Sequence, residues 1–164
     1  MIRTTGRVTA AIIVAAIFVA DQATKLFVLH GVDFSAGPLR VLPFMNITLV
    51  YNRGISYGLF QTEGVGRWVL VAVTAGAAIA LGIWMWRAVR PVVRLALAMI
   101  VGGALGNLVD RVAYGAVVDF VQLHAAGWSW YVFNIADAAI VLGVVLLVID
   151  GFLPVRARQK ESAG

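Results

Sequence analysis

Apolar residues along the chain fall into four long runs that are separated by polar segments. The runs cover about 8–29, 68–86, 92–110 and 133–153, and each is close to the ~20 residues that an α-helix needs to cross the hydrocarbon core of a bilayer. The second run contains no charged residue and begins and ends with tryptophan, a residue typical of the membrane interface. The pattern therefore predicts an α-helical integral membrane protein with four transmembrane helices.

The first apolar run is predicted to be a membrane helix and not a cleaved signal peptide. Signal peptides end in small residues at the cleavage site. Here Phe18 and Val19 lead into Asp21, and the apolar pattern resumes at Leu26. Because there is also no internal repeat, residues 1–164 are interpreted as a single membrane domain.

The segment between the first two helices, about 30–67, has the pattern of a strand. Residues 45–51 alternate roughly between apolar and polar types with β-branched content, and Asn52, Arg53 and Gly54 supply turn chemistry. We therefore expect a small β-containing outer segment, a sheet or hairpin, between helices 1 and 2.

The basic residues predict how the helices are oriented. In a four-helix arrangement, eight of the thirteen Lys and Arg residues flank the same face: Arg3, Arg7, Arg87, Arg90, Arg94, Arg156, Arg158 and Lys160. The positive-inside rule makes that face cytoplasmic. Both termini are then expected inside, and the segment 30–67 and a second loop, 112–132, are expected outside.

Composition narrows the picture by exclusion. The chain is 62% hydrophobic and 13% charged, whereas soluble domains are about 45–50% apolar and about 25% charged. The absence of cysteine excludes disulfides, thiolate catalysis and Cys-ligated metal sites. The net charge of +5 is accounted for by the basic cytoplasmic face, so no nucleic acid partner is expected.

Strongly polar residues gather at one depth, just inside the outer face. Asp21 and Lys25 are four residues apart near the outer end of the first helix and so share a helix face. The other members lie at the outer ends of the third and fourth helices and in the loop between them: Asn107, Asp110, Arg111, Asp119, Asn134 and Asp137. Ionisable residues inside a membrane are costly and by default indicate function. Asp150, near the inner face, is the exception and has no assigned role.

The chemistry of this layer is limited mainly to carboxylates. The two histidines have no HExxH motif around them, so a metallopeptidase is disfavoured and no metal is expected. Ser56 with Lys25 is a weak candidate for a nucleophile and its base. Two Asp side chains that share one proton, in contrast, can activate a water and protonate the carbonyl oxygen of an amide.

Asp119 and Asp137 are the preferred pair. Asp137 lies in the first turn of the fourth helix, whose N-terminus favours an anion, and Asp119 lies in a loop able to fold back over it. Asp110 is interpreted as the ion-pair partner of its neighbour Arg111. Asn134 and Asp137 fit a helix capping box equally well, so a purely structural role stays open for them.

Other functions also stay open at this level. A small ion or proton transporter places Asp, Lys and Arg in the membrane, but its polar residues should extend through the whole depth. A non-catalytic scaffold packed through Gly102 and Gly106, a GxxxG pair, would tolerate loss of the Asp119 carboxylate. Asp21 and Lys25 are more simply a buried structural pair than a catalytic one.

Five short motifs resemble those of the lipoprotein signal peptidases, also called signal peptidase II. In order along the chain they are DQATK at 21–25, NRGISYG at 52–58, GGALGNLVDR at 102–111, VVDF at 117–120 and FNIAD at 133–137. The second motif has Tyr57 where the family usually has Phe, which keeps an aromatic ring.

The resemblance implies an intramembrane aspartic endopeptidase of the bacterial cytoplasmic (inner) membrane, with its active site near the outer face. It implies that Asp119 and Asp137 form the catalytic dyad. The residues that it implies in shaping or supporting the site are Asn107, Arg111, Asn134, Asp21, Lys25, Asn52, Gly54, Gly103 and Asp110. The family's substrate is a prolipoprotein, cut on the amino side of a cysteine that carries diacylglycerol. No metal or organic cofactor is implied; the expected partners are such prolipoproteins and membrane lipid, and the chain is expected to be a monomer.

Overall fold

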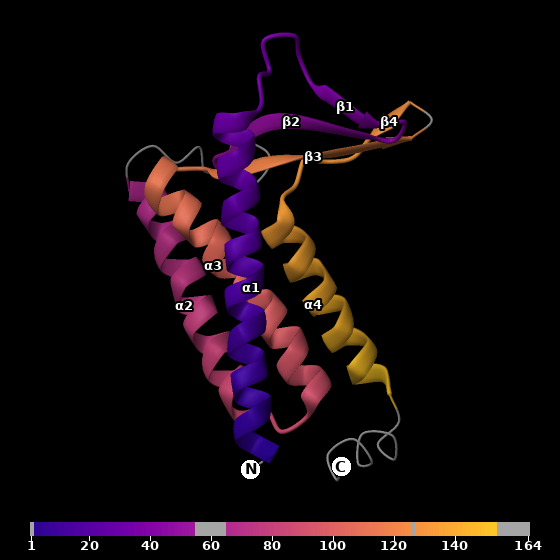
Figure 1. Cartoon of the computed structure of the whole chain (residues 1–164). Helices are drawn as coiled ribbons and strands as arrows, with labels where there is room; N and C mark the ends of the chain where they lie inside the picture. The colour runs from indigo at the N-terminus through magenta and orange to yellow at the C-terminus, as the bar shows by residue number, and fades with distance from the viewer. Residues whose placement is uncertain (1, 55–64, 126, 154–164) are drawn as a thin grey trace.

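The computed structural model describes residues 2–54, 65–125 and 127–153, and it contains four long helices. They are α1 (Ile2–Gly31), α2 (Val65–Arg87), α3 (Pro91–Tyr114) and α4 (Ile135–Phe152). All four are long and apolar enough to cross a membrane, which confirms the predicted fold class. Figure 1 shows the four helices running alongside one another, with a sheet across one end of the bundle. The beginning of α1, the α2–α3 turn and the end of α4 lie at the opposite end.

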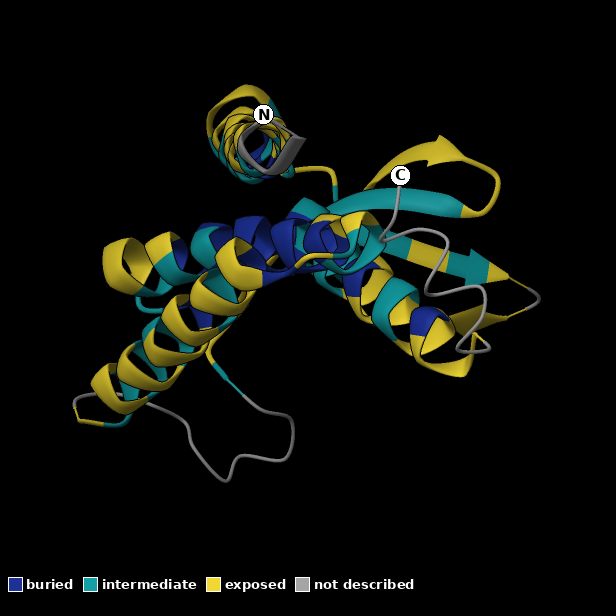
Figure 2. Ribbon diagram, turned by 90° about the horizontal axis from the view of Figure 1, so that it is seen from below, coloured by how far each residue is buried: buried dark blue, intermediate teal, exposed yellow. Residues whose placement is uncertain are grey.

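The third helix, α3, is the centre of the bundle. It packs against α1, α2 and α4, and half of its residues are buried; Figure 2 shows the buried residues gathered toward the middle of the bundle. The other three helices expose large apolar side chains such as Val19, Trp68 and Val141. A surface of this kind is expected where lipid tails surround a protein, because an apolar side chain can contact lipid tails without a cost in free energy.

Glycines on α3 bring its neighbours close. A side chain at Gly103 would meet the Ala136 carbonyl oxygen of α4 at 2.4 Å, and one at Gly102 would meet the Val14 carbonyl oxygen of α1 at 3.1 Å. The packing role predicted for this glycine-rich stretch is therefore visible in the structure. Close approach of backbones compensates in a membrane for the missing hydrophobic driving force between helices.

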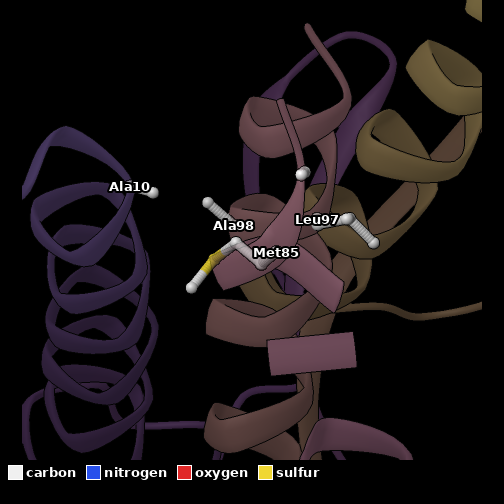
Figure 3. Close-up of a cluster of buried hydrophobic side chains, with 5 residues drawn as sticks. Ala10, Met85, Leu97 and Ala98 are labelled. Carbon is white, nitrogen blue, oxygen red and sulfur yellow. The ribbon is translucent and has the colours of Figure 1, made fainter. Parts of the chain in front are cut away.

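A small apolar core joins three helices at the end that lies away from the sheet. It contains Ala10 of α1, Met85 of α2, and Leu97 and Ala98 of α3, together with Ala88 from the turn (Figure 3). Small residues dominate this core, so the helices lie near one another there as well.

The sheet has four antiparallel strands in the order β1-β2-β3-β4. They are β1 (Leu39–Leu42), β2 (Met45–Asn52), β3 (Val117–Ala125) and β4 (Trp128–Ser129). The strand predicted from the alternation before Asn52 is thus present as β2. The interpretation of 112–132 as a loop was wrong, because residues 117–125 form β3, which pairs with β2 over more than sixty residues of sequence separation.

Candidate active site

A buried lysine organises the layer of polar residues beneath the sheet. Lys25 Nζ of α1 lies 2.7 Å from Asp21 Oδ2, 2.7 Å from Asp110 Oδ2 and 3.1 Å from Asn107 Oδ1. Lys25, Asp21 and Asp110 are 2% exposed or less. Three acceptors match the three N–H donors of an ammonium group, so this buried cation is fully satisfied.

This arrangement decides two questions that the sequence left open. Asp21 and Lys25 do form a buried structural pair. Asp110, however, pairs with Lys25 and not with its neighbour Arg111 as predicted, because consecutive residues of a helix point in different directions. Lys25 is also committed to its three acceptors, which disfavours it as a base; Ser56 itself lies outside the described residues.

Two structural carboxylates link the helices to the elements that carry the dyad candidates: Asp21 links α1 to α4, and Asp110 links α3 to β3. Asp21 Oδ1 accepts the Ala136 N–H in the first turn of α4 at 2.9 Å, and Asp110 Oδ2 accepts the Val118 N–H of β3 at 3.0 Å. Gly106 leaves room for this link, since a Cβ there would lie 2.4 Å from Asp21 Oδ2. The two structural carboxylates therefore position β3 and α4 relative to the buried lysine.

Asn134 and Asn107 connect this structural network to Asp119 and Asp137. The Asn134 side-chain amide donates to Asp119 Oδ1 at 2.7 Å and to Asn107 Oδ1 at 3.1 Å, and its backbone N–H donates to Asp137 Oδ2 at 3.4 Å. Asn107 Nδ2 donates to Asp137 Oδ1 at 2.8 Å. One asparagine thus contacts both carboxylates.

The capping box expected at the start of α4 is present as well. Asn134 Oδ1 accepts the Asp137 N–H at 2.8 Å, and the Asp137 carboxylate accepts the Asn134 N–H in return. Structural and chemical roles are compatible here, because the cap occupies Asn134 Oδ1 while the Asn134 amide nitrogen reaches Asp119.

Asp119 lies on β3 opposite Val50 of β2, and not in a flexible loop as predicted. It is 1% exposed, whereas Asp137 is half-buried. Its Oδ2 accepts from the Asn52 amide at 3.1 Å, and Asn52 Oδ1 in turn accepts the Gly54 N–H at 3.2 Å. Burial raises the pKa of Asp119 to about 6 by disfavouring its charged form; the hydrogen bond from Asn52 opposes this shift and the nearby Asp137 charge adds to it.

The remaining predicted residues border the dyad. The Arg111 guanidinium donates to the Asn107 carbonyl oxygen at 3.3 Å, one turn below it on α3. Gly54, two residues after Asn52, adopts a φ of 143°, which favours glycine. All eleven predicted site residues are described, and these contacts bring ten of them together at the sheet end of the bundle; Gly103 lies farther down α3, where it packs against α4.

Two residues of the layer carried no assigned role in the sequence. Gln22 Nε2 contacts Asp110 Oδ1 at 3.1 Å and the Gly106 carbonyl oxygen at 3.2 Å; its place between Asp21 and Lys25 was the available signal. Arg67 of α2 donates to the Arg111 carbonyl oxygen at 2.9 Å and to the Val112 carbonyl oxygen. It satisfies carbonyls at the end of α3, and nothing in the local sequence indicates this partner.

The depth of the polar groups argues against a conduction path. Asp150 pairs with Arg90 at the opposite end of the bundle. Of the buried α3 residues between that pair and the site, Arg94 is charged and lies one turn above Arg90, and the others are apolar: Ala96, Leu97, Ala98, Ile100, Val101, Gly102, Gly103 and Ala104. Within the described residues, an ion or proton would find no row of polar groups to follow across the bundle.

Comparison with known proteins identifies the family. Residues 13–153 match the family described as signal peptidase (SPase) II. A lipoprotein signal peptidase of Methylobacterium radiotolerans is 56% identical over 88% of this chain and 85% of its own length. One from Methylobacterium sp. strain 4-46 is 59% identical over 83% of this chain and 84% of its own length.

Solved structures have the same fold. A bacterial membrane enzyme determined at 1.9 Å by the in meso method has a TM-score of 0.77 and 29% identity, covering 88% of this chain and 92% of its own. A second, determined at 2.3 Å, has a TM-score of 0.75 and 30% identity, covering 87% of this chain and 86% of its own. The chain therefore belongs to the signal peptidase II family and is a multi-pass membrane peptidase.

Proposed function

We propose that this chain is an aspartic endopeptidase whose catalytic groups are Asp119 and Asp137. The observation that carries the proposal is that both carboxylates, from a strand and from a helix, contact the same residue, Asn134. Two carboxylates held near one another favour a state in which the pair has a single proton, because like charges at short range disfavour double ionisation.

The two carboxylates differ in ways that suggest their roles. Asp119 is buried and its pKa is raised to about 6, so it is protonated more readily than an ordinary Asp, which suits a role as the initial acid. Asp137 is half-buried, accepts N–H groups from Asn107 and Asn134, and lies in the first turn of α4. These donors and the positive end of the helix dipole favour a carboxylate there, and its partial exposure gives water access.

Hydrolysis then proceeds in two proton-balanced steps. The Asp137 carboxylate takes a proton from water as the water oxygen bonds to the scissile carbonyl carbon, and Asp119 gives its proton to the carbonyl oxygen. In the second step Asp137 gives its new proton to the amide nitrogen as the C–N bond breaks. Asp119 recovers a proton from a hydroxyl of the tetrahedral intermediate, which leaves a carboxylic acid product and restores the starting state of the dyad.

The proposed substrate is a prolipoprotein, cut on the amino side of a cysteine that carries diacylglycerol. Family membership and the names of the similar proteins support this class of substrate. The site also lies where the helices meet the sheet, a depth at which a lipid-anchored peptide bond would be held beside acyl chains and within reach of water.

We further propose that this end of the bundle faces outward across a bacterial cytoplasmic membrane, with both termini inside. The support is the count of basic residues at the other end. A monomer is the proposed active unit, since all groups of the network come from one chain.

Cleavage of a peptide with and without the lipid tests the proposed substrate. Purified protein in nanodiscs is incubated with a lipobox peptide whose cysteine either carries diacylglycerol or is unmodified, and products are identified by mass spectrometry. We expect cleavage of the lipidated peptide alone, immediately before the cysteine. Equal cleavage of both peptides, or a cut elsewhere, would contradict the proposed specificity.

A further inference from the structure

The end of the bundle opposite the active site contains a buried arginine with no carboxylate partner among the described residues. Arg94 of α3 is 9% exposed, and its Nη2 group donates to the Ala88 carbonyl oxygen. Its Nε atom is buried and has no hydrogen-bond partner. A buried guanidinium without a carboxylate partner is costly, and an anion that reaches the edge of the group lowers this cost.

Such a space is present beside Arg94. A cavity of about 240 Å³ opens between α1 and α3, lined by Gly6, Thr9, Ala10, Ile13, Pro91, Arg94 and Leu95. One part of its wall is the arginine, and most of the rest is apolar. The cavity is much larger than the ~30 Å³ that one water occupies in the liquid, so it has room for a larger group.

Gly6 is part of what makes the site. A Cβ at Gly6 would lie 2.2 Å from Arg94 Nη1, so any side chain at this position would displace the guanidinium. The absence of a side chain allows the Arg94 guanidinium to lie against α1 at the cavity.

The chemistry of the cavity matches an anionic phospholipid. Arg94 is three residues from the start of α3, or roughly 4.5 Å along its axis, which is a headgroup depth for a helix that begins at the membrane surface. No side chain caps the first N–H groups of α3, and the positive end of this helix adds to the attraction for an anion. A guanidinium next to apolar walls suits a phosphate joined to acyl chains better than a free phosphate ion.

We infer that this cavity binds the phosphate group of an anionic phospholipid, with Arg94 as the main ligand and the acyl chains lying against Ile13 and Leu95. The site is at the far end of the bundle from the dyad, so it is a separate lipid site and does not depend on the proposed cleavage mechanism.

Native mass spectrometry of the full chain in an uncharged detergent tests the inference. The apparent Kd is measured for phosphatidylglycerol and for phosphatidylcholine with matched acyl chains. We expect phosphatidylglycerol to bind more tightly, and Arg94→Gln to weaken it on the order of tenfold, the loss expected for a charge-assisted hydrogen-bonded contact. Gly6→Ala should produce a similar loss of affinity by displacing the guanidinium. Because alanine favours helix, this second variant should fold, so the inference can still be tested if Arg94→Gln folds poorly.

Arg87→Gln is the matched control, because Arg87 is an exposed arginine at the same end of the bundle. It should leave the affinity within twofold of the wild-type value. Equal losses in Arg87→Gln and Arg94→Gln would indicate diffuse surface attraction and overturn the site. Equal binding of the two lipids would overturn it as well, and displacement of the bound lipid by millimolar inorganic phosphate would show that a free phosphate, and not a lipid, is the ligand.

Discussion

At the sheet end of the bundle one lysine is surrounded by two carboxylates and an amide, whereas at the opposite end Arg90 pairs with Asp150, and Arg94 has no carboxylate among the described residues. The first group is almost completely buried. At the other end the Arg90 side chain is 19% exposed and Asp150 is 7% exposed. Charge deep in a membrane protein has to be satisfied internally, whereas charge near a surface can also use water or lipid headgroups.

The sheet end of the molecule requires the more exact geometry. In the sheet-end network, Lys25 holds Asp21 and Asp110, and these hold the first turn of α4 and the start of β3. The dyad residues lie on those two elements. The structural charges thus determine how far apart the proposed catalytic carboxylates lie, while the ion pair at the other end connects the α2–α3 turn to the end of α4.

The largest effect on stability is expected for Lys25→Met. It leaves Asp21 and Asp110 as uncompensated buried carboxylates, for which the expected loss is about 3–5 kcal/mol in the free energy of unfolding. Unfolding followed by circular dichroism in mixed detergent micelles measures this. Adding Asp21→Asn and Asp110→Asn to Lys25→Met should recover part of the loss, and no recovery would argue that Lys25 acts through packing and not through charge.

Asn134→Ala is expected to affect catalysis more than folding. It removes the amide that contacts Asp119 and Asn107, so we expect kcat on the lipidated peptide to fall on the order of 100-fold, as for loss of a group that orients an acid or base. The lost helix cap should cost about 1 kcal/mol of stability. Asn46→Ala, which removes a side-chain contact to Gln122 elsewhere in the sheet, is the control and should keep a kcat close to wild type.

A smaller effect is expected for Asp150→Asn at the opposite end. Asp150 is buried but its partner Arg90 is partly exposed, so the expected loss of stability is about 1–3 kcal/mol, less than for Lys25→Met, with cleavage unchanged. The same unfolding titration as for Lys25→Met measures it. A loss as large as that of Lys25→Met would remove the contrast between the two ends.

A pH dependence of stability is also expected at the sheet end. The pKa of Asp119 is raised from its ordinary value of 3.8 to about 6, so its contribution to stability is fully present below pH 3.8 and is lost as the pH rises through about 6. Asp119→Asn lacks this loss. The Tm of the variant minus that of wild type should therefore increase between pH 4 and pH 7, as measured by thermal scans in detergent.

Asp33→Asn is the control for this titration. Asp33 has its pKa lowered, mainly by the Ser35 backbone N–H, so it titrates below pH 4. Its Tm difference should be flat over the same range. A flat profile for Asp119→Asn as well would contradict a carboxyl group whose charged form is disfavoured by burial.

Features that depend on local sequence were predictable. The four helices follow from the length and hydropathy of their runs, and the depth of Asp21, Asn107 and Asn134 follows from a fixed rise per residue. The five motifs also contain the residues that the structure brings to one end of the bundle.

Features that depend on pairing between distant segments could not be predicted in the same way. Asp119 was assigned to a loop because β3 finds its partner, β2, far away in the sequence. The partner of Asp110 is likewise distant, on α1, and the partner of Asp150 lies at the start of α3. The rise per residue of a helix gives the depth of a side chain, but it does not say which residues of two helices face each other.

The central claim, that Asp119 and Asp137 together activate water, is tested most directly by the cleavage rate of the diacylglyceryl lipobox peptide with Asp119→Asn and Asp137→Asn. Both variants keep the size of the side chain, and folding is checked by thermal unfolding in the same nanodiscs. The account predicts that each variant, although inserted and folded, loses activity on the order of 1,000-fold or more. Cleavage at the wild-type rate by either folded variant would contradict it.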